Sequence, residues 1–439
     1  MRILHVSALP VWSMKGEGGM PSLRQTLDGH RRAGHSVTLV LPAYDIFSEG
    51  TARRIMPTDA SKEDEVAPCR WFPAMLQVRT LAKRMNRGQL PYAARWLLNV
   101  GTWLLLTVSL LLAGLRLRYR RKRRFDLVYA HNQYAAIAGW LLGGILGVPN
   151  VTRLYGTFLA DLMRRPLVWL RYPVAAGGFL VPHSLLICGN DGTRGDEVAK
   201  RLRIDLAKFR FWQNGVDKPD VLPTADRRLL SATAPPNLRP QARWVFTCSR
   251  LSYWKRIDRI LHAGAYGRRA GADCQILVAG DGPERANLES LAGELGIASD
   301  VVWLGAVPHG RIWQWLVAAD VFIIANDVTN RCNPLYEAIC AGLPVVSLRD
   351  PSTADLLTHG ENSLLADRTD GEDLGRCLRQ TLSDDGLASA MRQAQRRRAA
   401  TFQTWAQRMA METDELEALI ARSAGKGMTA PKAGTIHAN

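Results

Sequence analysis

Hydrophobic and polar positions follow two alternating patterns along the chain. Short apolar runs rich in β-branched residues are separated by longer stretches in which apolar residues recur every three or four positions. In the first half these runs are RILHV (2–6), SVTLVL (36–41), DLVYA (126–130), VTRL (151–154) and LLIC (185–188). Strands that alternate with helices are typical of a parallel sheet with helices on both faces. The pattern therefore predicts an α/β fold.

A second series of the same kind begins near the middle of the chain. Its strand-like runs are RWVFTC (243–248), QILVAG (275–280), VVWLG (301–305), VFIIA (321–325) and PVVSL (344–348), with helical patterns between them. Two such series predict two doubly wound, Rossmann-like domains. Sheets of this kind bind ligands at the carboxyl ends of their strands, so residues that directly follow the strands are the candidates for chemistry.

The boundary between the two series is a segment rich in Pro and Ala, residues 220–241, which lacks a clear period. We interpret it as a linker between an N-terminal domain, 1–219, and a C-terminal domain, 242–403. A helical pattern at 404–421 follows and is expected to return toward the first domain. The small and polar residues 422–439 are expected to be disordered.

One segment of the first domain, residues 95–124, departs from the alternating pattern. Residues 96–115 carry no charge, and seven Lys or Arg residues follow between 116 and 124. The length suits a transmembrane helix. A span, however, would separate strands 2–6 and 126–130 of one sheet.

The alternative is a helix that packs on the sheet, but such a helix normally has a polar outer face. Here Asn99, Thr102, Ser109 and Ala113 form only a narrow, weakly polar stripe. We therefore expect the helix to lie partly in the lipid leaflet, with its basic end on anionic headgroups. This predicts a cytoplasmic protein bound peripherally to the cytoplasmic face of the inner membrane.

Charge and cysteine content narrow the classes of function. The net charge is +17, and residues 66–125 hold thirteen Lys or Arg and no acidic residue. Nucleic acid and an anionic membrane both suit that charge. The apolar run that interrupts it disfavours nucleic acid, which needs basic residues interleaved with stacking aromatics. The seven cysteines are scattered and odd in number, as expected of reduced thiols in a cytosolic protein. The first ten residues are expected to form a strand and a turn and not a signal peptide.

Two cations follow the first strand of the second series. Arg250 and Lys255 could converge on a diphosphate, with Arg as a fork and Lys as a point charge, although two such residues are often a solvated loop. The next strand ends in GDGPE (280–284), a tight turn that contains Gly282 and lies at the same edge of the sheet. A single turn of this kind is more often structural, but its place at the same edge as Arg250 makes Gly282 a candidate donor-binding residue.

A glycine-rich loop, GEGG at 16–19, follows the first strand and precedes a helix. Gly18 and Gly19 would let backbone N–H groups approach an anion. The spacing fits neither a dinucleotide-binding motif nor a P-loop. No two aspartates stand two positions apart, so the D-x-D arrangement that holds a metal on a nucleotide sugar is missing. We expect no metal and no cofactor.

The stretch 329–346, TNRCNPLYEAICAGLPVV, places Glu337 in the expected first turn of a short helix after a polar loop. The helix dipole favours an acidic side chain at the helix N-terminus, so capping is the simple interpretation of Glu337. The loop residues that precede it, Asn333, Pro334 and Leu335, are the candidates for binding a ligand at this helix N-terminus.

Taken in order, these motifs resemble retaining glycosyltransferase family 4, of the GT-B fold, over nearly the whole chain to about residue 420. The matching stretches are RILHVS, DLVYAHN (126–132), QNGVD (213–217), SRLSYWKR (249–256), AGDGPE (279–284) and NPLYEAICAGLPVV (333–346). The resemblance implies that Glu337 binds the ribose hydroxyls of a nucleotide sugar. It also reveals two departures: Thr329 stands where the family usually has a Glu that contacts the sugar, and Tyr155 replaces a histidine before Gly156.

The resemblance implies transfer of a sugar from a UDP- or GDP-sugar, with retention, onto a membrane-associated glycolipid or growing glycan. Arg250, Lys255 and Glu337 are the expected catalytic residues, and His131 and Tyr155 lie on the expected acceptor side. His131 is equally compatible with a structural role. Asp327 is a candidate replacement for the missing carboxylate. The rival hypothesis is a non-catalytic module that binds nucleotide sugar or glycan and assists a partner.

Overall fold

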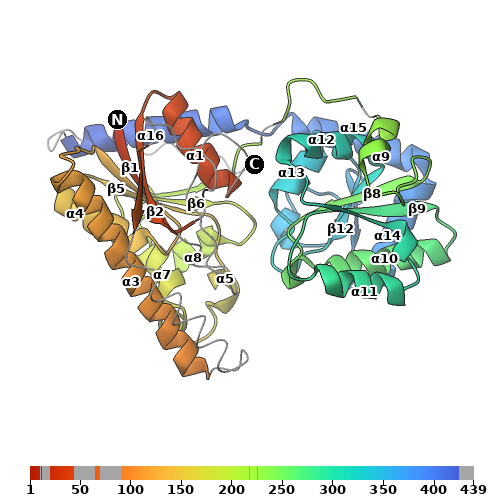
Figure 1. The fold of residues 1–439 in the computed structure, drawn as a ribbon, viewed down its shortest axis with the longest axis horizontal. Coiled ribbons are helices and arrows are strands. Elements are labelled where there is room, and N and C mark those ends of the chain that lie inside the picture. The colour runs from red at the N-terminus through yellow and green to blue at the C-terminus, as the bar shows by residue number, and fades with distance from the viewer. Residues whose placement is uncertain are drawn as a thin grey trace. The chain divides into compact units, whose positions relative to one another are not determined.

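The structure is a computed structural model that describes residues 1–9, 11, 20–43, 65–69, 91–216, 218–224 and 226–424. The chain forms two compact units (Figure 1). The first contains residues 1–189 and 196–212 together with the described residues from 406 onward, and the second contains 190–195 and 213–405. The predicted disordered tail, 422–439, lies outside the described residues from 425 onward.

The first unit is built on a parallel sheet with the strand order β3-β2-β1-β4-β5-β6-β7. Its strands are β1 (Arg2–Ser7), β2 (Ser36–Pro42), β3 (Glu65–Cys69), β4 (Leu127–His131), β5 (Asn150–Leu154), β6 (Leu185–Gly189) and β7 (Phe209–Trp212). Its helices are α1 (Pro21–Arg32), α3 (Tyr92–Tyr119), α4 (Ala136–Leu146), α5 (Leu159–Leu162), α6 (Val168–Arg171), α7 (Pro173–Leu180), α8 (Gly195–Arg201) and α16 (Trp405–Ala424). The strand order reverses between β1 and β4, as in doubly wound folds.

The second unit repeats this plan with the order β10-β9-β8-β11-β12-β13, again all parallel. Its strands are β8 (Arg243–Cys248), β9 (Cys274–Ala279), β10 (Val301–Gly305), β11 (Val321–Ile324), β12 (Val345–Leu348) and β13 (Ser363–Ala366). Its helices are α9 (Arg227–Thr233), α10 (Ile257–Arg269), α11 (Arg285–Glu294), α12 (His309–Ala318), α13 (Asn333–Cys340), α14 (Gly371–Ser383) and α15 (Asp385–Ala399). The predicted α/β architecture with two Rossmann-like domains is confirmed.

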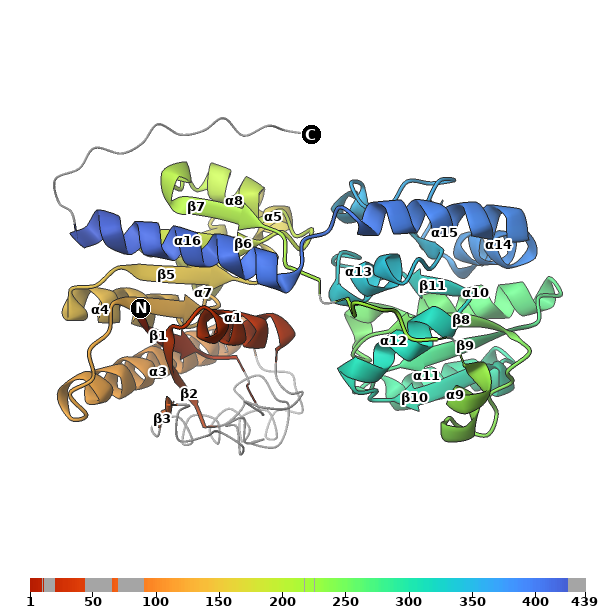
Figure 2. The same ribbon diagram turned by 90° about the horizontal axis from the view of Figure 1, so that it is seen from above.

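Alternation along β1 explains how the first sheet is covered. Leu4 and Val6 face the core that α3 and α4 complete, whereas Ile3 faces the core that contains Leu416 and Leu419 of α16. Successive strand residues point to opposite faces, so each strand serves two helix layers. Figure 2 shows α16 running along the sheet of the first unit.

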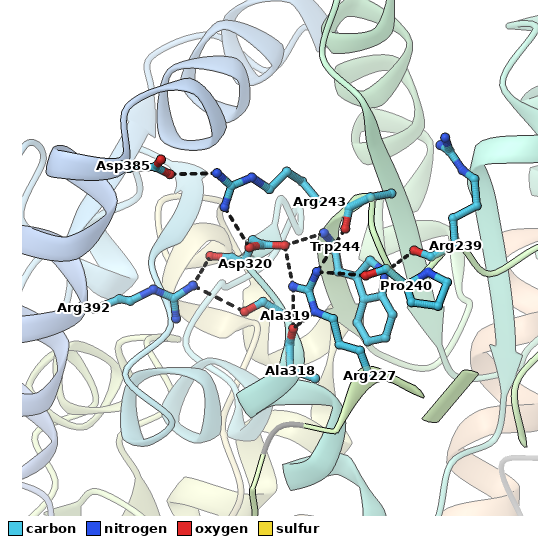
Figure 3. A network of polar contacts seen from close by, with 11 residues as sticks. Arg227, Arg239, Pro240, Arg243, Trp244, Ala318, Ala319, Asp320, Asp385 and Arg392 are labelled. Atoms are coloured by element: carbon cyan, nitrogen blue, oxygen red, sulfur yellow. Dashed lines mark hydrogen bonds and ion pairs between the residues drawn. The ribbon is translucent and has the colours of Figure 1, made fainter. Parts of the chain in front are cut away.

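The segment expected to be a linker, 220–241, contains α9 and belongs to the second unit. Arg227 fixes it there: its Nη2 donates to Asp320 Oδ2 at 2.7 Å, and its guanidinium lies 4.5 Å from the ring centroid of Trp244. Arg243 and Arg392 also contact Asp320, through its Oδ1 and its backbone carbonyl (Figure 3). This network ties α9, β8 and α15 together at the amino ends of β8 and β11, away from the carboxyl ends.

Helix α3 packs on the sheet with two residues of its polar stripe, Thr102 and Ser109, turned inward, whereas Asn99 is exposed. Thr102 and Ser109 are buried, and their hydroxyls donate to the carbonyls of Leu98 and Leu105 in the same helix. Because those hydroxyls are satisfied within the helix, they can face the protein at little cost. Large apolar side chains instead point outward, among them Leu97, Leu104, Leu105, Val108 and Leu112.

Candidate functional site

The carboxyl ends of β8 and β11 lie side by side at the point where the strand order of the second sheet reverses. The loop after β8 carries Arg250 and Lys255, and the loop after β11 leads to Thr329 and α13. Doubly wound sheets bind ligands at such a switch point. The predicted donor-side residues therefore belong to loops at one edge of one sheet.

The loop after β8 is held by the turn after β9. Leu251 N donates to Asp281 O at 3.0 Å, and Glu284 N donates to Leu251 O at 3.1 Å. A Cβ on Gly282 would lie 2.3 Å from Leu251 O, so no larger residue fits there. Gly282 thus lets the two loops approach, and it supports the segment that carries Arg250.

Arg250 is exposed and Lys255 is half-buried. Among the described residues, neither has a carboxylate within ion-pair distance, whereas neighbouring Arg256 is paired with Asp258 and Asp327. Two uncompensated cations at a strand end favour binding of an anion.

The charges of Lys255 and Glu337 both affect the pKa values of two thiols, Cys248 and Cys332. Burial raises the pKa of Cys248, at the end of β8; the charge of Glu337 raises it further, and the charge of Lys255 lowers it. Burial likewise raises the pKa of Cys332, with Lys255 again opposing and Glu337 adding to the shift. The loop after β8 and helix α13, which follows β11, extend from adjacent strands at the same edge of the sheet.

Glu337 is buried, with 6% of its surface exposed. Helix α13 begins at Asn333, so Glu337 is in the second turn and no acidic residue occupies the first. This differs from the expected position because Asn333 and Pro334 are themselves helical, and proline is well tolerated at the start of a helix. Helix capping does not account for Glu337. Its observed partner is His309, whose Nε2 lies 2.9 Å from Oε1.

The start of α13 offers fewer backbone donors than the sequence predicted. Pro334 has no N–H, and Leu335 N donates to Cys332 O at 3.0 Å. Within the described part of the chain, the N–H of Asn333 has no acceptor. Of the three predicted positions, Asn333 is the one that can supply a backbone N–H to a ligand.

Thr329 is engaged both by its own loop and by the backbone of residue 191. Its hydroxyl donates to Asp191 O at 2.8 Å and accepts from Arg331 N at 3.0 Å. Thr329 therefore stabilises the backbone of the second unit around residue 191. The candidate replacement carboxylate, Asp327, pairs with Arg259 at 2.6 Å and with Arg256 at 3.2 Å. Both side chains therefore have partners within the protein, whereas Arg250 has no ion-pair partner among the described residues.

The acceptor-side candidates lie in the first unit, at the ends of β4 and β5. His131 is completely buried, with Nε2 at 2.8 Å from His5 Nδ1 and Nδ1 at 2.8 Å from the Tyr155 hydroxyl. Both ring nitrogens thus have partners within the protein, and the buried ring presents no surface to a ligand. The Tyr155 hydroxyl points inward to His131, so the partly exposed ring is the part of this residue that a ligand can reach. Gly18 and Gly19 lie outside the described residues.

These histidines belong to a buried polar cluster anchored by Glu412 of α16. Tyr129 donates to Glu412 Oε1 at 2.6 Å, and Arg153 and Arg408 contact Oε2 at 3.1 and 3.0 Å. Although burial opposes the charged form, the two arginines hold the pKa of Glu412 well below its usual range. Burial, followed by neighbouring positive charge, lowers the pKa values of His5 and His131, so both are neutral.

Sequence reasoning missed His309 and Glu412. His309 opens α12, 28 positions before its partner, and no local pattern links it to Glu337. The sequence did contain a signal that Glu412 is buried and paired. It lies four residues after Arg408 and four before Leu416, on the apolar stripe of α16, and a charge on such a stripe indicates a buried partner.

Comparisons with known proteins agree with this architecture. Residues 233–398 match the family model described as "Glycosyl transferases group 1". The solved structure of Anabaena HepE in complex with UDP has a TM-score of 0.65 at 17% identity and covers 95% of this chain and 100% of that one. Residues 233–398 are therefore similar to the group 1 glycosyl transferases, and the chain as a whole has the GT-B fold.

Two curated relatives match parts of the chain. The 2-deoxystreptamine N-acetyl-D-glucosaminyltransferase of Streptomyces fradiae is 26% identical over 274 residues, which cover 60% of this chain and 64% of that protein. The lipopolysaccharide core biosynthesis glycosyltransferase LpsE of Rhizobium meliloti (strain 1021) is 34% identical over 112 residues, 26% of this chain and 32% of that protein. The chain thus spans less than two thirds of the length of either relative.

Proposed function

We propose that this chain transfers a sugar from a nucleotide diphosphate sugar, with retention and without a metal, onto a membrane-associated glycolipid or growing glycan. The observation that carries the proposal is that the cations Arg250 and Lys255 and the buried carboxylate Glu337 follow the adjacent strands β8 and β11 at the switch point of the second sheet. They lie within residues 233–398, which match the group 1 glycosyl transferases. A carboxylate for ribose and cations for phosphate are what a nucleoside diphosphate requires.

The donor would be held from both ends of its nucleotide. Glu337 uses Oε2 to accept from ribose hydroxyls, because Oε1 is engaged by His309. Arg250 and Lys255 contact the diphosphate, and the N–H of Asn333 adds a neutral donor. UDP bound to Anabaena HepE supports a nucleotide in a fold of this kind, and a UDP- or GDP-sugar is the proposed donor.

The proposed reaction breaks the bond between the sugar C1 and the β-phosphate oxygen. The acceptor hydroxyl oxygen forms a bond to C1 from the same face, and its proton passes to the departing phosphate oxygen. This step needs no protein nucleophile. The catalytic task of the chain is to stabilise the charge that grows on the diphosphate, and Arg250 and Lys255 perform it.

The proposed acceptor side is the first unit, at an anionic membrane surface. Helix α3 presents outward leucines next to the exposed basic residues Arg116, Arg120, Lys122 and Arg124. An apolar helix face flanked by cations suits the interface of an anionic leaflet, where each basic residue contributes ~1 kcal/mol. The helix is long and apolar enough to cross a membrane by composition, but a share of it is buried against the sheet, which favours peripheral binding.

Liposome flotation tests the membrane part of the proposal. Wild type should float with anionic vesicles and much less with neutral ones. The variant with Arg120, Arg121, Lys122, Arg123 and Arg124 replaced by Gln should float less. Equal recovery of both proteins in the soluble fraction would contradict membrane binding.

A panel of UDP-, GDP- and ADP-sugars in a thermal-shift assay tests the donor part. A ligand at 100 times its Kd stabilises the folded state by ~2.7 kcal/mol, so the correct nucleotide should raise the Tm clearly above the others. No shift with any nucleotide sugar would contradict the proposal.

The second candidate function is a module that binds the nucleotide sugar without turnover. Its support is that Thr329 and Asp327 are both engaged by the protein itself, so neither presents a carboxylate for the sugar. Turnover discriminates: the module would bind nucleotide saturably and release no nucleoside diphosphate.

A further inference from the structure

A cavity of about 270 Å³ lies in the first unit, at the same edge of the sheet as His131 and Tyr155. Four segments build it: the first turns of α3, the loop after β4, the loop after β5, and the junction of α6 with α7. Both aromatic rings and amides line it, among them Trp96, Asn99, Gln133, Tyr134, Phe158 and Tyr172. Its volume is at the lower end for small-ligand sites, ~300–1,000 Å³, so it suits one section of a larger molecule.

The walls are fixed by specific contacts. Trp96 Nε1 donates to Leu170 O at 2.9 Å, which joins α3 to α6 across the cavity. Phe158 and Tyr172 form an edge-to-face pair with centroids 5.4 Å apart. On α7, a Cβ at Gly178 would come within 2.7 Å of Gln133 Cβ, so glycine lets the loop after β4 pack directly on this helix.

The surroundings are apolar and basic. Leu97, Trp169 and Leu170 are 64%, 48% and 61% exposed, which continues the outward apolar face of α3 around the cavity. Arg171 lines the cavity and is exposed, and none of the described residues in the lining is acidic. An apolar rim and a cation at one opening match a molecule in which an apolar chain adjoins an anionic group.

We propose that this cavity binds the acceptor substrate as an amphiphile with a phosphate next to its apolar chain. The phosphate pairs with Arg171, the first part of the chain or its linked group lies among the aromatic rings, and the rest of the chain follows Leu97 and Leu170 toward the lipid surface. The identification of the bound amphiphile as the acceptor rests on the proposed function. The binding itself requires no donor.

Calorimetric titration of the full chain with farnesyl phosphate, below the concentration at which it forms micelles, tests the site. Asn99→Trp fills the cavity from an exposed position, and Arg171→Gln removes the charge. Both should weaken binding at least about tenfold, the equivalent of one lost charge-assisted contact. Arg32→Gln, which removes a cation from the exposed end of α1 and not from the cavity, should bind as wild type does.

Two further probes separate the parts of the ligand. Farnesol should bind more weakly than farnesyl phosphate and be insensitive to Arg171→Gln, whereas inorganic phosphate alone should not bind measurably. Equal farnesyl phosphate affinity in wild type and Asn99→Trp would overturn the inference. Donor nucleotide binding, measured on the same samples, keeps the outcomes distinct. Nucleotide turnover without amphiphile binding overturns this site alone, and amphiphile binding without nucleotide binding overturns the proposed function alone.

Discussion

His309 Nε2 lies 2.9 Å from Glu337 Oε1, and this contact joins the start of α12 to the second turn of α13. The carboxylate is buried, whereas half of the His309 side chain is exposed. One oxygen of Glu337 is therefore oriented by the protein, and the other remains for a ligand. A carboxylate fixed in this way loses little freedom when it binds two neighbouring hydroxyls.

Glu337→Gln should weaken nucleoside diphosphate binding by about 1–3 kcal/mol, because charge-assisted bonds to the ribose are lost. The amide keeps the shape of the side chain, so the Tm should change little. Calorimetry with the nucleotide that gives the largest thermal shift measures the effect. Unchanged affinity would remove Glu337 from the nucleotide site.

His309→Ala serves as the companion variant. It frees Oε1 without removing the carboxylate, so the loss of affinity should be smaller than in Glu337→Gln. A larger loss would mean that His309 itself contacts the nucleotide.

Arg250→Ala and Lys255→Ala should each lower turnover by about 10²–10³-fold, the usual loss for one preorganised group that stabilises developing charge. Both side chains lack an ion-pair partner among the described residues, so the fold should survive. Arg269→Ala, at the exposed end of α10, is the matched control and should leave kcat unchanged. Full activity in Arg250→Ala would contradict the assignment of the diphosphate site.

Asp320→Asn should destabilise the second unit by about 3 kcal/mol, since it leaves Arg227 and Arg243 without their shared carboxylate. Asp385→Asn is the control: Asp385 also pairs with Arg243, but its side chain is 81% exposed, so the loss should be below about 1 kcal/mol. Chemical denaturation measures both. Equal effects would show that the network does not hold α9 and α15 in place.

Acid should destabilise the first unit before it affects the second. The pKa values of His5 and His131 are lowered in the folded state, so the unfolded chain binds more protons as the pH falls below ~6.5. The stability from neutral histidines is complete above that pH and is lost as the pH falls toward the folded-state values. The slope is at most ~1.4 kcal/mol per pH unit for each group.

Melting curves between pH 7 and pH 5 measure this dependence. His5→Gln should make the fall of stability with pH less steep by the contribution of one histidine. His262→Gln, at an exposed position on α10, should leave the slope as it is in wild type. An identical slope in wild type and His5→Gln would contradict a neutral, buried His5.

The sequence predicted most of the fold because its strands are strongly apolar and its helices periodic. It missed β3 and β13, whose sequences EVAPC and SLLA are short and poor in β-branched residues. It also left open which way α3 faces. The rule that polar residues point outward fails there, because Thr102 and Ser109 satisfy their hydroxyls within the helix.

The candidate site was predictable only where residues follow strands. Arg250 and Glu337 could be found from position and motif. The engagement of Thr329 by Asp191 O could not, because it depends on a contact between segments 138 residues apart. The inward direction of the Tyr155 hydroxyl likewise depends on His131, which only the folded sheet brings near.

The most direct test of the central claim follows a nucleotide sugar and a lipid-linked acceptor by NMR in the presence of the full chain. The account predicts release of nucleoside diphosphate that depends on the acceptor, persists in EDTA and is lowered about 10²–10³-fold by Arg250→Ala. It also predicts a product whose anomeric configuration matches that of the donor. Saturable nucleotide binding without any release, across UDP-, GDP- and ADP-sugars, would contradict it.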